Sequence, residues 1–133
     1  MPASDSTRTA YSTPEASKPA AAYSQGMRAA GLVFTAGQGG HDPETGELPD
    51  GIEAQTRRAL DNVEAILRAG NSSLADALKV SVFLADRADY AAMNAVYAEY
   101  MPEDPGVRTT VQAGLGKGML VEIDVIALAR PPA

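Results

Sequence analysis

The chain of 133 residues contains no cysteine and no tryptophan, and its only histidine is His41. The absence of cysteine excludes disulfides, thiolate metal sites and cysteine nucleophiles. A single histidine cannot build a multi-histidine zinc site, and a magnesium site made of carboxylates alone is the remaining metal alternative.

Long apolar runs are also missing. A membrane helix needs roughly 20 apolar residues, and no stretch of this chain approaches that length. The amino terminus lacks the apolar segment of a secretory signal, so we expect a cytoplasmic protein without a membrane partner. Neither common glycine-rich nucleotide-binding motif occurs. The net charge of −6 makes nucleic acid an improbable partner, because an acidic surface repels phosphate backbones.

The length predicts one domain over residues 7–130, preceded by a disordered tail at residues 1–6. The first half predicts a short strand at residues 7–12 and a hairpin of strands 25–29 and 32–37, with Gly31 in the tight turn. A loop leads to a helix that begins near Ile52. Asp50 is its expected cap, with Glu53 at capping-box spacing. Gly70-Asn71 is the expected helix end.

The second half predicts a strand at residues 77–85, a helix from Asp86 or Asp89 to Met101, and strands at residues 107–113 and 119–129. The order β-β-β-α-β-α-β-β favours an α+β fold, a six-stranded mixed sheet with two helices on one face. Alternation in the fourth strand places four apolar residues on one face. These are Leu78, Val80, Val82 and Leu84.

The last two strands combine apolar residues with charged ones. The odd positions of residues 119–129 are all apolar, and we expect that face to pack under the helices. We expect the two strands to pair as a hairpin through GLGKG. That pairing would place Arg108, Thr110, Glu122 and Asp124 together on the face away from the helices. Because this face is otherwise apolar, we expect another subunit to cover it.

Two interpretations of this cluster are open on spacing alone. The acids and Arg108 would form a structural ion pair at a subunit interface, as arginine–carboxylate pairs often do. Alternatively, Arg108 would receive a substrate carboxylate, because its planar fork makes two parallel charge-assisted hydrogen bonds. Glu122 would then hold or activate a water molecule.

Eight segments resemble, in order and spacing, those of the reactive intermediate deaminase family, also called YjgF-like or Rid, over about residues 8–130. They are YSQG (23–26), TAGQ (35–38), DPETGEL (42–48), ALDNVEAIL (59–67), KVSVFLAD (79–86), MNAVYAEYM (93–101), VRTTV (107–111) and VEIDVIA (121–127). The resemblance implies a chorismate-mutase-like fold and a homotrimer whose sheets form a central barrel, with clefts between subunits.

The resemblance also implies a chemistry. Deaminating members of the family hydrolyse reactive enamines and imines, such as 2-aminoacrylate and 2-iminopropanoate, to keto acids and ammonia. They use no metal and no organic cofactor, so we expect none here. The expected partners are therefore a small imine or keto-acid ligand and two further copies of the chain.

Site residues follow from the resemblance by position. Arg108 matches the carboxylate-binding arginine and Glu122 the water-positioning glutamate. Tyr23, Gly37 and Asn94 match further substrate-binding positions. Each has a simpler interpretation, since Tyr23 could pack at an interface, Gly37 could end a strand, and Asn94 could brace a loop.

Some residues depart from the family pattern. Thr110, a further substrate-binding candidate, stands where many members have cysteine, and Ala36 stands where they have serine. The loop between Arg108 and Glu122 is one residue shorter than usual. These departures motivate two alternatives, a non-catalytic trimer that binds small carboxylates and a pathway-specific hydrolase with a larger substrate. His41 is interpreted as a solvated loop residue, and the tyrosines and methionines of the second helix as core.

Overall fold

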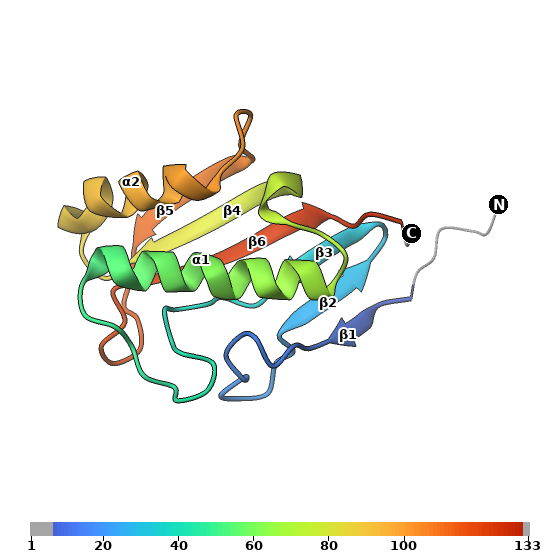
Figure 1. The fold of residues 1–133 in the computed structure, drawn as a ribbon, viewed down its shortest axis with the longest axis horizontal. Coiled ribbons are helices and arrows are strands. Elements are labelled where there is room, and N and C mark those ends of the chain that lie inside the picture. Colours follow the sequence, from blue (N-terminus) through green and yellow to red (C-terminus); the bar gives the residue numbers. More distant parts are fainter. Residues whose placement is uncertain (1–6, 132–133) are drawn as a thin grey trace.

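The computed structural model describes residues 7–131, and the predicted tail at residues 1–6 lies outside them. In this range a six-stranded sheet carries two α-helices on one face (Figure 1). The strands are β1 (Thr9–Tyr11), β2 (Gly26–Ala29), β3 (Leu32–Thr35), β4 (Ala77–Leu84), β5 (Val107–Gln112) and β6 (Val121–Leu128). The helices are α1 (Ile52–Ala69) and α2 (Tyr90–Tyr100), with 3₁₀ turns η1 (Leu74–Asp76) and η2 (Arg87–Asp89). The mixed sheet and the element order confirm the prediction.

The strand order is β1-β2-β3-β6-β4-β5, and only β4 and β5 are parallel. The predicted hairpin between the last two strands is therefore wrong, because β4 lies between them. The β4-α2-β5 crossover places β5 parallel beside β4. The other edge of β4 then pairs with β6. This arrangement puts β6, the strand with the fully apolar face, near the middle of the sheet under α1.

The register also separates the polar residues of the last two strands. Arg108 pairs with Val80, a core residue on the helix face, so its side chain lies on that face too. Thr110, two residues further along β5, lies on the same face. Glu122 and Asp124 alternate with β6 residues that are buried under the helices, so both point to the opposite face. The prediction that these four polar residues share one face is therefore wrong. It assumed a direct β5–β6 pairing that the structure lacks.

The core lies between the sheet and the two helices. Its buried side chains come from α1, α2, β3, β4 and β6; the largest are Leu60, Ile66, Leu67, Leu84, Met93, Ile123, Val33, Val63, Val80, Val82, Val121 and Val125. Leu78 was expected on the same face as Val80. A register shift between Ala77 and Lys79 turns it outward instead, and it is 42% exposed.

The ends of α1 differ in how well they were predicted. Asp50 does not cap the helix: Gly51 occupies the cap position with φ of 89°, and no side chain bonds there. Gly51 suits this conformation because it has no Cβ. The predicted end at Gly70-Asn71 is confirmed, with Asn71 left-handed at φ of 64°.

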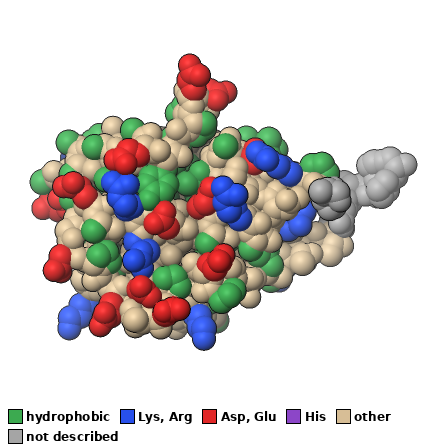
Figure 2. Space-filling view, in the orientation of Figure 1, with side chains coloured by type: hydrophobic (Ala, Val, Ile, Leu, Met, Phe, Trp, Pro, Cys, Tyr) green, Lys and Arg blue, Asp and Glu red, His purple; other side chains and the backbone are tan. Residues whose placement is uncertain are grey.

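The molecular face formed by the helices carries acidic and basic side chains interspersed (Figure 2). Among the described residues, three ion pairs involve α1, and two of them have largely exposed arginines, Arg57 with Glu99 of α2 and Arg68 with Glu64; the third joins Arg58 to Asp42. Exposed pairs of this kind contribute little to stability. In the part of the chain that the structure describes, neither helix combines the length and apolar character that a bilayer crossing requires.

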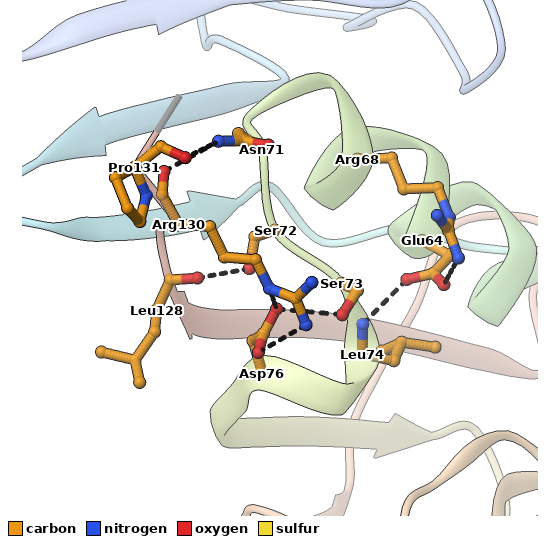
Figure 3. A network of polar contacts seen from close by, with 10 residues as sticks. All are labelled: Glu64, Arg68, Asn71, Ser72, Ser73, Leu74, Asp76, Leu128, Arg130 and Pro131. Carbon is orange, nitrogen blue, oxygen red and sulfur yellow. Dashed lines mark hydrogen bonds and ion pairs between the residues drawn. The ribbon is translucent and has the colours of Figure 1, made fainter. Parts of the chain in front are cut away.

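The turn after α1 binds the end of β6 (Figure 3). The Asn71 amide donates to the carbonyls of Arg130 and Pro131 at 2.8 and 3.1 Å, and the Ser72 hydroxyl donates to that of Leu128 at 2.6 Å. Arg130 forms an ion pair with Asp76 at 2.8 Å. Residues far apart in the sequence are thus joined where the sheet and α1 meet.

Two buried amide side chains of α1 hold the loops at the other end of the molecule. Gln55 donates to the carbonyls of Pro49 and Gly118 and accepts from the backbone N–H of Leu120. Asn62 donates to the carbonyls of Gly39 and His41 at 3.1 and 2.9 Å. The loops that follow β3 and precede β6 are therefore fixed to the helix.

We expect Asn62→Leu to lower the free energy of unfolding by about 2 kcal/mol, because it leaves two loop carbonyls without their buried donor. Chemical denaturation followed by circular dichroism measures this change. Thr56→Val is the matched control, since the buried Thr56 hydroxyl has no hydrogen-bond partner among residues 7–131. The control should be neutral or slightly stabilising, and equal losses in both variants would contradict the assigned role of Asn62.

Candidate functional site

Arg108 lies in β5, and its side chain contacts α2. Its guanidinium donates to Oδ1 of Asn94 at 2.8 Å and to the hydroxyl of Tyr90 at 2.6 Å. The guanidinium carbon lies 4.5 Å from the ring centre of Tyr97 and 5.5 Å from that of Tyr90. Aromatic faces stabilise a cation without neutralising it. These contacts therefore orient Arg108 and leave its charge available.

No ion pair between residues of the described part involves Arg108. A guanidinium has five N–H donors, and the two contacts above use only part of that capacity. Tyr97, which packs under it, is buried, and burial raises the pKa of its hydroxyl while the positive charge of Arg108 opposes the shift. Arg108 is thus a fixed cation with free donors.

A cavity of about 510 Å³ lies between η2, α2 and β5, and one of its walls is Tyr90, which accepts a hydrogen bond from Arg108. Its lining residues are Leu84, Arg87, Tyr90, Thr110, Val111 and Gln112. The hydroxyl of Thr110 is buried there, and it has no hydrogen-bond partner among residues 7–131. A buried hydroxyl without a partner is uncommon and indicates a missing ligand or water. We call this space the β5 cavity.

Glu122 lines a second cavity, of about 520 Å³, on another side of the molecule. We call it the Glu122 cavity. Its walls include Tyr23, Gly37, His41 and Met119. His41 was interpreted as a solvated loop residue, but its backbone is held by Asn62 and it lines this cavity. Sequence spacing could not find it, because the loop at residues 37–46 has no periodic structure.

Gly37 has a specific steric role beside Glu122. A Cβ atom built at this position would lie 2.5 Å from Oε2 of Glu122 and 2.9 Å from its carboxyl carbon. Any larger residue would therefore displace the carboxylate. Gly37 is therefore more than a strand end, because the absence of a side chain there leaves room for the carboxylate of Glu122.

Two carboxyl groups on this side of the sheet hold their protons more firmly than usual. Burial raises the pKa of Glu122, and the negative charge of Asp124 raises it further, while His41 partly opposes the shift. Burial also raises the pKa of Asp124, against the opposing effects of Ser81 and Lys79. Glu122 is thereby a better proton acceptor than an exposed glutamate.

Within residues 7–131, no three His, Asp or Glu side chains gather to hold a metal ion.

The six predicted site residues fall into two groups within one protomer. Arg108, Asn94 and Thr110 lie on the helix face by β5, whereas Glu122, Gly37 and Tyr23 line or adjoin the Glu122 cavity. Strand β4 separates the two groups, and they open on opposite faces of the sheet. One protomer therefore presents two separate groups of predicted site residues, which we call half-sites.

Sequence reasoning missed two tyrosines of the first half-site. Tyr90 and Tyr97 were interpreted as core, yet both contact Arg108, and Tyr90 is 46% exposed. Their spacing indicated a shared position, because Tyr90, Asn94 and Tyr97 recur at intervals of four and three and therefore lie on one side of a helix. Only the position of β5 showed that this side faces an arginine.

Residues 13–129 match the sequence profile of the family described as Endoribonuclease L-PSP. The chain belongs to this family, which is the YjgF-like or Rid family. A RutC family protein of Pyrococcus horikoshii is 47% identical over 86% of this chain and 93% of its own length. The 2-iminobutanoate/2-iminopropanoate deaminase of Escherichia coli K12 is 38% identical over 81% of this chain and 88% of its own.

Solved structures of Rid proteins confirm the chorismate-mutase-like fold. Yeast Mmf1 superposes with a TM-score of 0.88 at 36% identity, over 93% of this chain and all of that one. Escherichia coli TdcF with bound serine gives a TM-score of 0.85 at 35% identity, over 92% of this chain and 99% of that one. Relatives named as imine deaminases support a hydrolase or deaminase role at the level of the Rid family.

The raised pKa of Glu122 predicts a pH-dependent difference between wild type and Glu122→Gln. A raised pKa means that the folded state binds the proton more tightly than the unfolded state, so the contribution to stability is present at low pH. It is lost as pH rises from 4.5, the ordinary value, through the raised pKa. We expect Glu122→Gln to be more stable than wild type at neutral pH, and urea denaturation should show the difference shrinking as pH falls through the raised pKa toward 4.5. A difference that stays constant with pH would contradict the raised pKa.

Proposed function

We propose that this Rid protein hydrolyses 2-imino acids and their enamine tautomers, including 2-iminopropanoate and 2-aminoacrylate, to 2-keto acids and ammonia. The observation that carries the proposal is the fixed guanidinium of Arg108, whose partners within the described range are neutral. The relative named 2-iminobutanoate/2-iminopropanoate deaminase supplies the reaction class. A substrate of this class carries a carboxylate, which is the group that such an arginine binds.

The proposed role of Arg108 is to bind and orient the carboxylate. Its free N–H donors can make parallel hydrogen bonds to both oxygens. Asn94 and Tyr90 hold the guanidinium plane before the ligand arrives. The conformational entropy that the Arg108 side chain loses on binding the ligand is therefore smaller than for a mobile side chain. The buried Thr110 hydroxyl, which lacks a partner among the residues described, lies where it can donate to the same ligand.

Glu122 is proposed to position the attacking water and accept its proton. The water oxygen bonds to the imine carbon, and the electron pair of the C=N bond moves to nitrogen, which is protonated. The resulting carbinolamine loses ammonia as the C–N bond breaks and the carbonyl forms. An enamine first takes a proton on its terminal carbon. Because an iminium carbon is already electrophilic, positioning alone can supply several kcal/mol of the rate enhancement.

The two half-sites require a second subunit in this proposal. Arg108 of one protomer and Glu122 of the next would meet at each interface of a homotrimer, which closes because every subunit offers both groups. The sheet face away from the helices supports this assembly, since it exposes Val107 and Val111 in β5. Exposed apolar surface of this kind marks interaction sites.

A second candidate function is binding without turnover. The TdcF structure, which holds serine, favours it because that ligand also carries a carboxylate. In this alternative Arg108 serves the same purpose, and the protein senses a small carboxylate or keto acid. An endoribonuclease role, which the family description names, is disfavoured by the net charge of −6.

We expect Arg108→Ala to lower kcat/KM for 2-iminopropanoate by roughly a hundredfold or more, because the carboxylate loses its charged partner. The imine is generated in the cuvette by an amino acid oxidase acting on alanine, and keto-acid release is followed. Arg108→Lys should recover only a small part, since an ammonium cannot make the bidentate contact. Arg68→Ala, on the exposed side of α1, is the control and should keep the wild-type rate.

The outcome that contradicts the hydrolase is a wild-type protein that gives no acceleration over buffer. Saturable binding of pyruvate in calorimetry, lost in Arg108→Ala, would then assign the binding function instead. An unchanged rate in Arg108→Ala would contradict the role of this arginine in either function.

Mixed assemblies test whether the site joins two subunits. Arg108→Ala and Glu122→Ala should each be inactive as pure proteins. Unfolding and refolding them together should restore about a quarter of the wild-type rate, because in random head-to-tail interfaces that fraction combines an intact Arg108 with an intact Glu122. The rate of keto-acid release measures the recovery.

The matched control mixes Arg108→Ala with wild type at the same ratio. It measures the rate of trimers in which every intact Arg108 comes from a wild-type subunit. Sedimentation verifies the trimer in each sample. If the two variants mixed into trimers and no activity returned, the shared site would be wrong.

A further inference from the structure

The β5 cavity is lined by one arginine, Arg87, which the proposed reaction does not use. Arg87, in η2, lines this cavity with Tyr90 and Thr110. Its side chain makes no hydrogen bond or ion pair with any residue from 7 to 131, and it is exposed. A three-carbon imino acid bound at Arg108 would leave much of the cavity unfilled, since its volume of about 510 Å³ is in the range that accommodates larger ligands.

Arg87 belongs to a continuous polar row. Arg87, Tyr90, Asn94 and Tyr97 recur at intervals of three, four and three, so they share one side of η2 and α2. This row faces the helix side of β5, where Arg108, Thr110 and Gln112 alternate. Asn94, which binds Arg108, lies seven positions after Arg87, and this corresponds to roughly 10 Å along the helix axis.

The backbone of Arg87 is fixed at this place. Its N–H donates to Oε1 of Gln112 at 2.8 Å, which joins the start of η2 to the end of β5. Asp86 is the nearest acid in the sequence, but its carboxylate accepts from the N–H of Ala88 at 2.9 Å and caps the turn. Neither Asp86 nor Asp89 forms an ion pair with Arg87 in the described structure.

We propose, resting on the proposed hydrolase function, that the preferred substrates are imines of dicarboxylic amino acids. Arg108 binds the carboxylate next to the imine carbon, and Arg87 binds the distal carboxylate. The buried hydroxyl of Thr110, which has no partner among residues 7–131, lies two residues after Arg108 in β5, lines the cavity together with Arg87 and donates to the ligand. Two arginines in a chain of net charge −6 make a local positive site on an acidic molecule, which suits a dianion.

The distal charge, rather than length, is the feature that Arg87 recognises. The imines derived from glutamate and methionine are similar in length, and only the first carries a second carboxylate. We expect the wild-type protein to favour the glutamate-derived imine in kcat/KM by roughly tenfold, the usual range for one charge-assisted hydrogen bond at a partly exposed site. Added salt should reduce this preference, because Arg87 is exposed.

The experiment compares the glutamate-derived and methionine-derived imines, each generated in situ by an amino acid oxidase that accepts the parent amino acid. Arg87→Ala should reduce the ratio of the two kcat/KM values to near one, mainly through KM for the glutamate-derived imine. Arg87→Lys should restore part of the ratio, since a cation remains. Arg68→Ala, the surface control, should keep the wild-type ratio.

Two results would overturn the substrate assignment. One is a wild-type ratio near one, and the other is a ratio that Arg87→Ala leaves unchanged. Both differ from failure of the hydrolase itself, in which the alanine-derived imine is not turned over either. In that case calorimetry compares the binding of 2-oxoglutarate with that of pyruvate. If wild type binds 2-oxoglutarate more tightly and Arg87→Ala abolishes this difference, the two-arginine site is supported. Equal binding of the two keto acids to wild type rejects it.

Discussion

The insertion of β4 between β5 and β6 is the constraint on which the rest of the site depends. Direct pairing of β5 with β6 would bring Arg108 and Glu122 onto one face, where an arginine and an acid would neutralise each other. The parallel β4–β5 pairing instead turns Arg108 toward α2, while the antiparallel β4–β6 pairing turns Glu122 to the opposite face. Arg108 and Glu122 are thereby kept apart within one protomer.

The surroundings of the two groups differ in a way that suits their proposed roles. Arg108 is held by an amide, a hydroxyl and aromatic faces, which fix its plane and leave its charge available for an anion. Glu122 lies in a partly buried cavity beside Asp124, and both effects raise its pKa. Gly37 leaves room for the carboxylate, since a side chain there would collide with it. The proposed imine hydrolysis uses both, a cation to bind the carboxylate and a carboxyl group to accept a proton.

The loops that follow β3 and precede β6 are held in position by hydrogen bonds to buried amide side chains rather than by regular secondary structure. Gln55 and Asn62 occupy the apolar side of α1, where periodicity alone predicts hydrophobic residues, and each makes hydrogen bonds to loop backbone. Buried amides are stabilising only when their partners are present. The loop that carries His41 and the loop that precedes β6 are thus positioned by two residues that face the core.

The amino-acid sequence by itself determined the element order, the helix and strand limits to within a few residues and the apolar face of β6. It did so because alternation, helical spacing and turn residues are local signals. The six candidate site residues came instead from the resemblance to the Rid family. Only the tertiary structure decided which strand lies beside which, and therefore that Arg108 and Glu122 occupy different faces. Strand neighbours are set by the β4-α2-β5 crossover and by burial of β6, which are non-local. For the same reason the places of Tyr90 beside Arg108, Arg87 in the β5 cavity and His41 in the Glu122 cavity became visible only when β5 and the loops were in place.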